Sequence, residues 1–195
     1  FRSARLLWSQ IVKAYNPEDE ESLKLIVHSE TNTCNKTVYD PYVNMLRTQT
    51  EAMSAVLGGT DSITVLPFNA IFEEPTEFSE RIARNQQILL KEESHLDKTA
   101  DPAAGSYYIE NLTQSLVDEA WKLFLEVQDK GDFTAAFREG FIQQEVKEMA
   151  EKRNMNLAQR RDSLVGINQF PDFSEKARTA LDASLFQPTD LTEED

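Results

Sequence analysis

The sequence is poor in cysteine and has no long apolar run. Cys34 is the only cysteine among 195 residues, so an internal disulfide is impossible, and a reducing, cytoplasmic setting is the natural expectation. No apolar run approaches the roughly 18 residues that a membrane-spanning helix needs. No signal-peptide pattern opens the sequence. We therefore expect no membrane association.

Basic residues and histidines are also scarce. The chain has 20 Lys and Arg against 34 Asp and Glu, a formal net charge of −14. Nucleic-acid binding is excluded on this ground, because neutralising phosphates requires clustered cations. The two histidines, His28 and His95, lie 67 positions apart, and no second cysteine accompanies Cys34. No zinc-site spacing exists, so we predict no metal site.

The apolar residues that are present alternate between helical and extended patterns. In the first half this predicts helix, strand, helix, strand, helix, which is typical of βα units around a parallel sheet. The second half is predominantly helical. The expected helices cover residues 1–15, 41–57, 76–93, 109–128, 132–139 and 141–162, and the expected strands cover 23–28, 62–66 and 163–170.

This pattern predicts an α/β fold that is rich in helix. A closed (β/α)8 barrel needs roughly 250 residues, so the chain can hold only part of a TIM barrel, with about three parallel strands. We expect βα units over residues 1–100, a helical extension with the last strand over 101–170, and a polar tail over 171–195. The opening "FRSARLLW" resembles the middle of a domain. An excised piece of a barrel exposes strand edges, so we expect it to self-associate.

Three residues could carry chemistry. His28 ends an apolar strand, where barrel enzymes keep catalytic groups, so it is either a substrate contact or acid/base, or a histidine bonded to a backbone group. His95 lies in a loop that ends a helix, where a structural role is favoured. Cys34 lacks a nearby base and is expected to be a buried or half-exposed thiol. From the residues alone, no catalytic constellation emerges.

Three stretches together resemble the barrel domain of the methylmalonyl-CoA mutase family. They are "DPYVNMLRTQTEAMSAVLGGTDSITVLPFN" (40–69), "PTEFSERIARNQQILLKEES" (75–94) and "DPAAGSYYIENLT" (101–113). "RIARN" and "DP-x-x-GSYY", in this order and spacing, are the specific signals. The similarity runs from residue 1 to about 170.

The resemblance implies a reaction and a cofactor. In this family a CoA thioester passes through the axis of the barrel and adenosylcobalamin lies over its C-terminal face. Homolysis of the cobalt–carbon bond starts a radical rearrangement between methylmalonyl-CoA and succinyl-CoA, and the protein positions the substrate and excludes water. A separate domain with an Asp-x-His-x-x-Gly motif grips the cobalamin. Nothing around His28 or His95 is similar to that motif, so we expect this domain to be absent here.

The chain departs from catalytic members at the positions that face substrate and cofactor. After the first strand they carry His-x-Gln-Thr-Ser-Gly, where this sequence has Glu30 for the Gln and Thr33 for the Gly. They carry Asn-Ser-Phe-Asp-Glu-Ala after the next strand, where Ala70 stands for the Glu. Ala103 replaces a Trp in the Asp-Pro loop. A side chain at 33 obstructs the approach of a flat macrocycle, and Glu30 adds negative charge beside a substrate carboxylate.

These substitutions resemble those of the small subunit of bacterial family members, which keeps the fold and lacks a functional site. The resemblance implies a partner, the catalytic large subunit, and adenosylcobalamin bound at the level of the complex but not by this chain. Arg2 matches an arginine that contacts CoA in catalytic members. We expect residues 101–106 to cap and turn the chain, and Tyr107 and Tyr108 to anchor the next helix. Two alternatives stay open: a catalytic acyl-CoA mutase with divergent cofactor contacts, and an unrelated stand-alone helical module.

Overall fold

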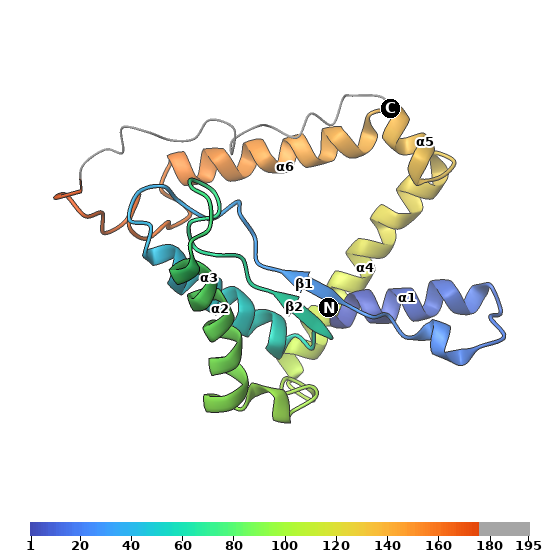
Figure 1. Cartoon of the computed structure of the whole chain (residues 1–195). Coiled ribbons are helices and arrows are strands. Elements are labelled where there is room, and N and C mark those ends of the chain that lie inside the picture. Colours follow the sequence, from blue (N-terminus) through green and yellow to red (C-terminus); the bar gives the residue numbers. More distant parts are fainter. Residues whose placement is uncertain (176–195) are drawn as a thin grey trace. The chain divides into compact units, whose positions relative to one another are not determined.

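The computed structural model describes residues 1–175 (Figure 1). The chain divides into two compact units, each assembled from separate stretches. Unit 1 comprises residues 1–27, 57–61 and 99–162. Unit 2 comprises residues 28–56, 62–98 and 163 onward. The three-part division of the chain at residues 100 and 170 stays a prediction.

Unit 2 contains a parallel pair of short strands. β1 (His28–Glu30) pairs with β2 (Ser62–Thr64), with His28 opposite Ser62 and Glu30 opposite Thr64. The connection between them runs through α2 (Val43–Leu57), which is the βα arrangement that the alternating pattern predicts. The described residues therefore form a helix-rich, partial α/β fragment with a small parallel sheet.

The helix after β2 begins with a reciprocal cap. Oγ1 of Thr76 accepts from the N–H of Ser79 at 3.2 Å, and the N–H of Thr76 donates to Oγ of Ser79 at 2.9 Å, so α3 (Glu77–Ile88) starts at a defined residue. The helix widens into a π-helical turn, η2 (Leu89–Glu93), and ends before the short 3₁₀ turn η3 (Leu96–Lys98).

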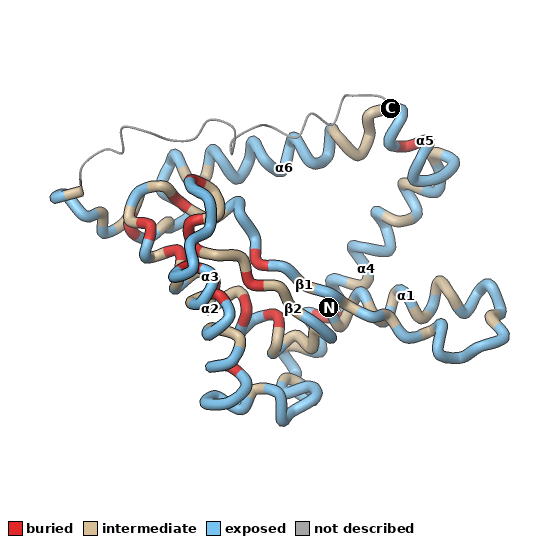
Figure 2. Tube along the Cα trace, in the orientation of Figure 1, coloured by how far each residue is buried: buried red, intermediate tan, exposed pale blue. Residues whose placement is uncertain are grey.

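The core of unit 2 lies between α2, the strand region and α3, where Figure 2 shows the buried positions gathered. It consists of Ala52, Val65, Ala83 and Leu90. The buried face of α2 is small and polar, with Asn44, Thr48, Ala52 and Ala55 recurring at helical spacing. Such a face lets neighbouring backbone approach α2 closely.

Unit 1 is helical. Its elements are α1 (Arg2–Ala14), the 3₁₀ turn η1 (Glu20–Leu23), α4 (Tyr107–Asp129), α5 (Phe133–Arg138) and α6 (Phe141–Ala158). α1 packs on α4, where Oγ of Ser3 donates to the carbonyl of Thr113 at 3.1 Å. None of the helices described over residues 1–175 has the length and apolar character needed to cross a bilayer.

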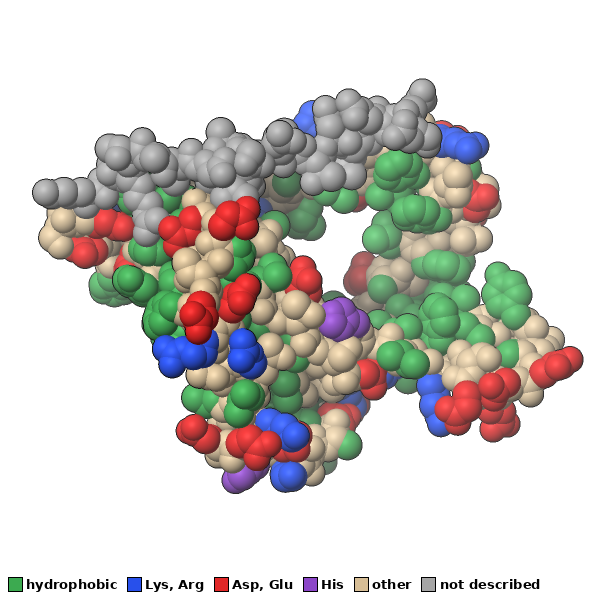
Figure 3. All heavy atoms as spheres, in the orientation of Figure 1, with side chains coloured by type: hydrophobic (Ala, Val, Ile, Leu, Met, Phe, Trp, Pro, Cys, Tyr) green, Lys and Arg blue, Asp and Glu red, His purple; other side chains and the backbone are tan. Residues whose placement is uncertain are grey.

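The helices of unit 1 leave much apolar surface uncovered. Thr113 is the only buried residue of α4, and Leu112, Leu116 and Leu123 on one side of that helix are exposed. Figure 3 shows hydrophobic side chains at the surface of the molecule. Exposed apolar surface of this kind favours association. We expect the 195-residue chain to self-associate, with a sedimentation coefficient that rises with concentration; a single compact monomer throughout would contradict this.

The first strand begins further along the sequence than predicted. Residues 23–28 were expected to be extended and paired, but β1 starts only at His28. Just before it, Val27 bonds to Asp61 twice: its N–H donates to Oδ2 of Asp61 at 2.7 Å, and its carbonyl accepts from the N–H of Asp61 at 2.9 Å. Ile26 is 81% exposed. An apolar run predicts a buried strand only where a neighbouring strand covers it, and the described residues supply none here.

The prediction of a third strand over residues 163–170 is wrong. This segment folds back on itself: the N–H of Gly166 donates to the carbonyl of Gln169 at 2.8 Å, and the N–H of Leu164 donates to Oδ1 of Asn168 at 2.7 Å. Gly166 has a φ of +83°, which suits a turn and not a strand. The described residues therefore contain two strands where about three were expected.

Gly166 offers a test of this turn. A Cβ there would lie 2.8 Å from Oδ2 of Asp40, whereas a Cβ at Gly140, whose φ is similar at +80°, would meet nothing within 4 Å. Gly140→Ala should cost only the backbone strain, about 1–2 kcal/mol. Gly166→Ala should cost about 1 kcal/mol more, because the extra methyl overpacks the turn. Urea unfolding of both variants measures the difference, and equal losses would contradict the close approach.

Two local expectations also need correction. The helix expected from Pro41 begins at Val43, because Asp40 adopts a φ of +46° and its carbonyl accepts from the N–H of Val43 in a turn. The loop 101–106 does turn the chain, with Gly105 at a φ of +78° and Ser106 as the N-cap of α4. Tyr107 and Tyr108, however, are 89% and 73% exposed and anchor nothing among the described residues. Most of the expected tail, 176–195, lies outside the described residues.

Candidate functional site

The candidate site is the edge of unit 2 where β1 and β2 end. Because the two strands are parallel, the loops that follow them emerge at the same edge, where βα folds keep ligand-binding groups. The chain segments stay joined beyond the strands. The N–H of Thr31 donates to the carbonyl of Thr64 at 3.1 Å, and the N–H of Leu66 donates to Oγ1 of Thr31 at 2.9 Å. The start of both loops is therefore fixed by the sheet.

His28 lies on β1 with both ring nitrogens engaged. Its Nδ1 is 2.7 Å from Oγ of Ser62, and its Nε2 is 3.2 Å from Oγ1 of Thr64. The partners are hydroxyls of the neighbouring strand and not the backbone group that a structural reading predicted. The ring is exposed and oriented by β2. A hydroxyl can donate or accept, so either tautomer satisfies this arrangement.

The three positions expected to face the cofactor all lie at or just after the ends of the two strands, and their role toward a cofactor stays a prediction. Glu30 ends β1, Thr33 lies in the loop after it, and Ala70 lies in the turns after β2. Glu30 and Thr33 are exposed and Ala70 is half-buried. Next to Ala70, Oδ1 of the buried Asn69 has no hydrogen-bond partner among the described residues. All four residues belong to unit 2.

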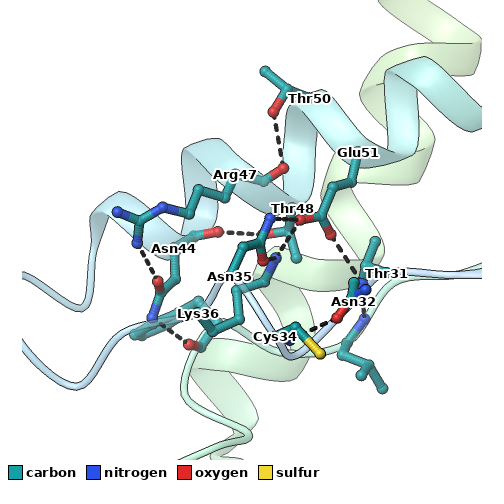
Figure 4. A network of polar contacts seen from close by, with 12 residues as sticks. Thr31, Asn32, Cys34, Asn35, Lys36, Asn44, Arg47, Thr48, Thr50 and Glu51 are labelled. Carbon is teal, nitrogen blue, oxygen red and sulfur yellow. Dashed lines mark hydrogen bonds and ion pairs between the residues drawn. The ribbon is translucent and has the colours of Figure 1, made fainter. Parts of the chain in front are cut away.

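The loop after β1 is held by one carboxylate from α2. Glu51 accepts from the N–H of Asn32 at 3.1 Å and from Nζ of Lys36 at 2.7 Å, and it also accepts from the amide of Asn35 (Figure 4). The side chain of Lys36 is only 3% exposed, and that of Glu51 is 22% exposed. Burial lowers the pKa of the Lys36 ammonium, and the bond to Glu51 opposes this shift. The ion pair therefore places the loop at a fixed position on α2.

Asn44 connects this loop with the one after β2. Its Nδ2 donates to the carbonyl of Thr37 at 2.8 Å and to the carbonyl of Phe68 at 3.1 Å. Its Oδ1 accepts from the N–H of Thr37 at 3.0 Å and from Arg47 at 2.6 Å, the latter contact drawn in Figure 4. Asn44 is fully buried, at 0% exposure. One amide therefore fixes the distance between the two loops.

The sequence did not predict that Glu51 and Asn44 hold the loops after β1 and β2. The signal available was weak: Asn44 and Thr48 occupy the inward face of α2, where an apolar residue is the usual choice. A polar residue on a core face indicates a buried hydrogen-bonding role. Its partners could not be named, because Phe68 lies 24 positions further along the chain.

Arg2, the position expected to contact CoA, belongs to unit 1 and is bound within the chain. Its guanidinium lies 2.7 Å from Oε1 of Glu110 and 3.3 Å from Oδ2 of Asp101. The bond from Arg2, followed by one from the N–H of Gly105, holds the pKa of Glu110 below its ordinary value. The arginine thus ties α1 to the start of α4 and to the loop before it. The CoA contact itself stays a prediction.

A titration tests this role of Arg2. Glu110 has a lowered folded-state pKa, so its contribution to stability is present above the ordinary glutamate pKa and is lost as the pH falls through the lowered value. Arg2→Met should raise the pKa of Glu110 and move the acid-unfolding midpoint to higher pH. Arg84→Met is the control, since Arg84 is exposed and makes no ion pair among the described residues. Identical acid midpoints for both variants and the parent would contradict this role.

Cys34 and His95, the other two residues that could carry chemistry, are both exposed. Cys34 is exposed, against the expectation of a buried or half-exposed thiol, because the Asn32 side chain turns its backbone outward by accepting from its N–H at 2.6 Å. His95 is exposed and has a φ of +52° after η2. Within residues 1–175, no three His, Cys, Asp or Glu side chains come together in a way that could hold a metal ion.

Comparison with known proteins gives a consistent result. The family model described as Methylmalonyl-CoA mutase matches residues 1–194. The chain is 55% identical to the methylmalonyl-CoA mutase small subunit of Porphyromonas gingivalis, over 91% of this chain and 29% of that protein. It is 40% identical to the large subunit of the same organism, over 87% of this chain and 24% of that protein. It is 42% identical to a methylmalonyl-CoA mutase of Rhizobium meliloti, over 87% of this chain and 24% of that protein.

The match extends over nearly all of this chain but only part of its relatives, of which the chain spans between 24% and 29%. The alternative of a helical module unrelated to the enzyme is thereby wrong. The extent of the match and the identity to several relatives lead to one conclusion: the chain belongs to the methylmalonyl-CoA mutase family.

Proposed function

We propose that this chain is part of a small subunit of methylmalonyl-CoA mutase that does not itself catalyse the reaction, and that it stabilises a catalytic large subunit. One comparison carries the proposal. Porphyromonas gingivalis has both subunits, and this chain is 55% identical to the small one but 40% identical to the large one. A chain with the role of a small subunit is expected to be more similar in sequence to a small subunit than to a large one.

The residues at the strand ends support a non-catalytic role. Glu30 presents an exposed carboxylate, and the branched side chain of Thr33 is exposed where catalytic members have glycine. Ala70 offers no carboxylate, and the neighbouring Asn69 directs its amide N–H to Glu73 at 3.0 Å. This set does not fit adenosylcobalamin as catalytic members hold it. The cofactor therefore belongs to the complex and not to this chain.

In this proposal the complex carries out the isomerisation of methylmalonyl-CoA and succinyl-CoA, and the partner of this chain is the large subunit in a heterodimer. Arg2, Asp101 and Glu110 form a structural cluster, and in this proposal the role of the arginine is to pack α1 on α4. The lone Cys34 suits a reducing compartment, and we place the complex in the cytoplasm.

A second function is favoured by one observation. His28 begins β1, and its exposed ring is oriented by Ser62 and Thr64, as a working acid/base or substrate contact requires. A catalytic acyl-CoA mutase with divergent cofactor contacts would keep such a histidine. The small-subunit proposal explains it as a support for the pairing of β1 with β2.

The deciding experiment titrates the full-length parent with adenosylcobalamin and a CoA thioester, alone and mixed with a large subunit. The proposal expects a stable one-to-one complex with the large subunit and no cofactor binding by the parent alone. Tight cobalamin binding by the parent alone that is abolished by Thr33→Trp would establish the catalytic alternative. Absence of any complex with the large subunit would refute the structural role.

A further inference from the structure

The loop formed by residues 165–175 is attached to unit 2 at both of its ends. At its start, the guanidinium of Arg47 on α2 donates to the carbonyl of Val165. At its end, the carboxylate of Glu175 accepts from the N–H of Asp40, with its two oxygens 2.9 and 3.0 Å from that nitrogen. All four residues belong to unit 2. The stretch between these contacts is therefore a loop whose ends are fixed.

This loop carries two phenylalanine rings that point into solvent. Phe170 is 84% exposed and Phe173 is 94% exposed, the highest value for a large apolar side chain within residues 1–175. A single exposed apolar side chain is ordinary and needs no explanation. Two phenylalanines three positions apart on a loop with fixed ends form an apolar patch, which is typical of an interaction surface.

The backbone of Phe170 is strained in the conformation that exposes its ring. Its φ is +49°, in the left-handed region that a bulky side chain rarely adopts. The next residue, Pro171, restricts Phe170 further, because its ring crowds the preceding residue. A ring that is 84% exposed regains little of this cost by packing within the chain. Strain of this kind is concentrated at sites where a side chain is held ready for a function.

Asp172 adds a negative charge between the two rings. Its Oδ1 accepts from the N–H of Ser174 at 2.8 Å and from Oγ of Ser174 at 2.7 Å. The bond from the Ser174 side chain, followed by the one from its backbone, lowers the pKa of Asp172, so the carboxylate stays ionised. The matching surface is an apolar pocket with a cation at its rim. An anionic membrane is a poor match, because it repels this carboxylate and a chain of net charge −14.

We infer that the 165–175 loop is a surface by which this chain docks on the large subunit, with Phe170 and Phe173 entering an apolar pocket that Lys or Arg side chains border. This inference rests on the proposed function, to which it adds the surface. Aromatic anchors carry much of the binding energy of an interface. The fixed ends of the loop lower the entropic cost of ordering it, and the charge of Asp172 speeds the encounter with a basic partner surface.

The test measures binding of the full-length parent to a large subunit by surface plasmon resonance. Phe170→Asn and Phe173→Ser each remove one ring, and each should weaken the complex about tenfold or more, mainly through faster dissociation. Asparagine tolerates the left-handed region, so the urea midpoint of Phe170→Asn should equal or exceed that of the parent. A lower midpoint would show that the ring stabilises the chain itself, and would overturn the inference.

Asp172→Asn tests the basic border of the pocket. It keeps the oxygen that accepts from Ser174 and removes the charge, so association should slow several-fold at low ionic strength and match the parent in high salt. An association rate equal to that of the parent at low ionic strength would overturn the basic border.

Tyr107→Ser is the matched control, because Tyr107 is 89% exposed but lies on α4, outside the loop. It should leave the affinity unchanged. Unchanged affinity of the two phenylalanine variants, or equal losses in Tyr107→Ser, would overturn the inference while a complex with the large subunit upholds the proposed function. If the parent instead self-associates through this loop, so that Phe170→Asn makes it monomeric in sedimentation, the occupant is a second copy and the inference is wrong. Absence of any complex with the large subunit would refute the proposed function and this inference with it.

Discussion

Replacement of Asn44 by Ala is expected to destabilise the chain by about 3 kcal/mol or more, because each buried polar group left without a partner costs about 1–3 kcal/mol. The change removes the donor to the carbonyls of Thr37 and Phe68 and the acceptor of the Thr37 N–H. No water can replace them easily at a position with 0% exposure. Urea unfolding followed by circular dichroism measures the loss.

Thr50→Ala, on the same helix, is the matched control. Thr50 is exposed and its hydroxyl bonds only to carbonyls of α2, so its removal should stay within about 0.5 kcal/mol. A loss below about 1 kcal/mol for Asn44→Ala would mean that the two loops are held mainly by Glu51 and Thr31.

The second large effect is expected at Glu51. Glu51→Leu leaves the ammonium of Lys36, with its side chain 3% exposed, without its counter-charge. Breaking a buried pair by removing one partner costs about 3–5 kcal/mol, and we expect the lower end of this range because Glu51 is itself partly open to solvent. The double variant Glu51→Leu with Lys36→Met should recover most of the loss, since no charge then stays buried.

The pH dependence of this variant has a definite sign. Burial lowers the pKa of Lys36 in the folded state, so the folded chain binds fewer protons than the unfolded chain below the ordinary lysine value of about 10.4. The deficit of Glu51→Leu should therefore shrink as the pH is raised toward that value. Glu119→Ala, which breaks the exposed pair with Lys122, should leave the stability unchanged within error at any pH, because solvent screens such a pair. A deficit of Glu51→Leu that grows with pH would contradict the assignment.

The helices were predictable from local pattern, and so was the second strand, expected over 62–66 and found as β2, but the first and third strands were not. α1, α3, α4 and α6 lie close to the ranges read from apolar spacing and from caps such as Thr76. The segment before His28 has the composition of a buried strand, yet residues 23–27 form no strand, and Val27 bonds to the side chain and the backbone N–H of Asp61, 34 positions away. Strand formation depends on a neighbour that a single stretch of sequence does not name.

The candidate site was also predictable only in part, because some of its contacts join residues that are far apart in the sequence. The resemblance placed Glu30, Thr33 and Ala70 after expected strands, and the structure has Glu30 at the end of β1 and Thr33 and Ala70 in the segments after β1 and β2; their role toward a cofactor stays a prediction. It said nothing of Asn44 and Glu51, whose roles depend on the geometry of α2 against both loops. The strand expected over 163–170 failed because Asn168 and Gly166 favour a closed turn, in which side-chain and backbone bonds replace a sheet ladder.

The interleaving of the two units along the chain constrains the order in which the protein can fold during synthesis. Unit 1 needs residues 1–27 together with 99–162, so its first helix has left the ribosome long before the helix that packs on it exists. Closing such long loops is slow compared with local helix formation. Unit 2 can assemble β1, α2, β2 and α3 from residues 28–98 much earlier. During translation, the apolar side of α1 therefore stays uncovered until α4 has been synthesised.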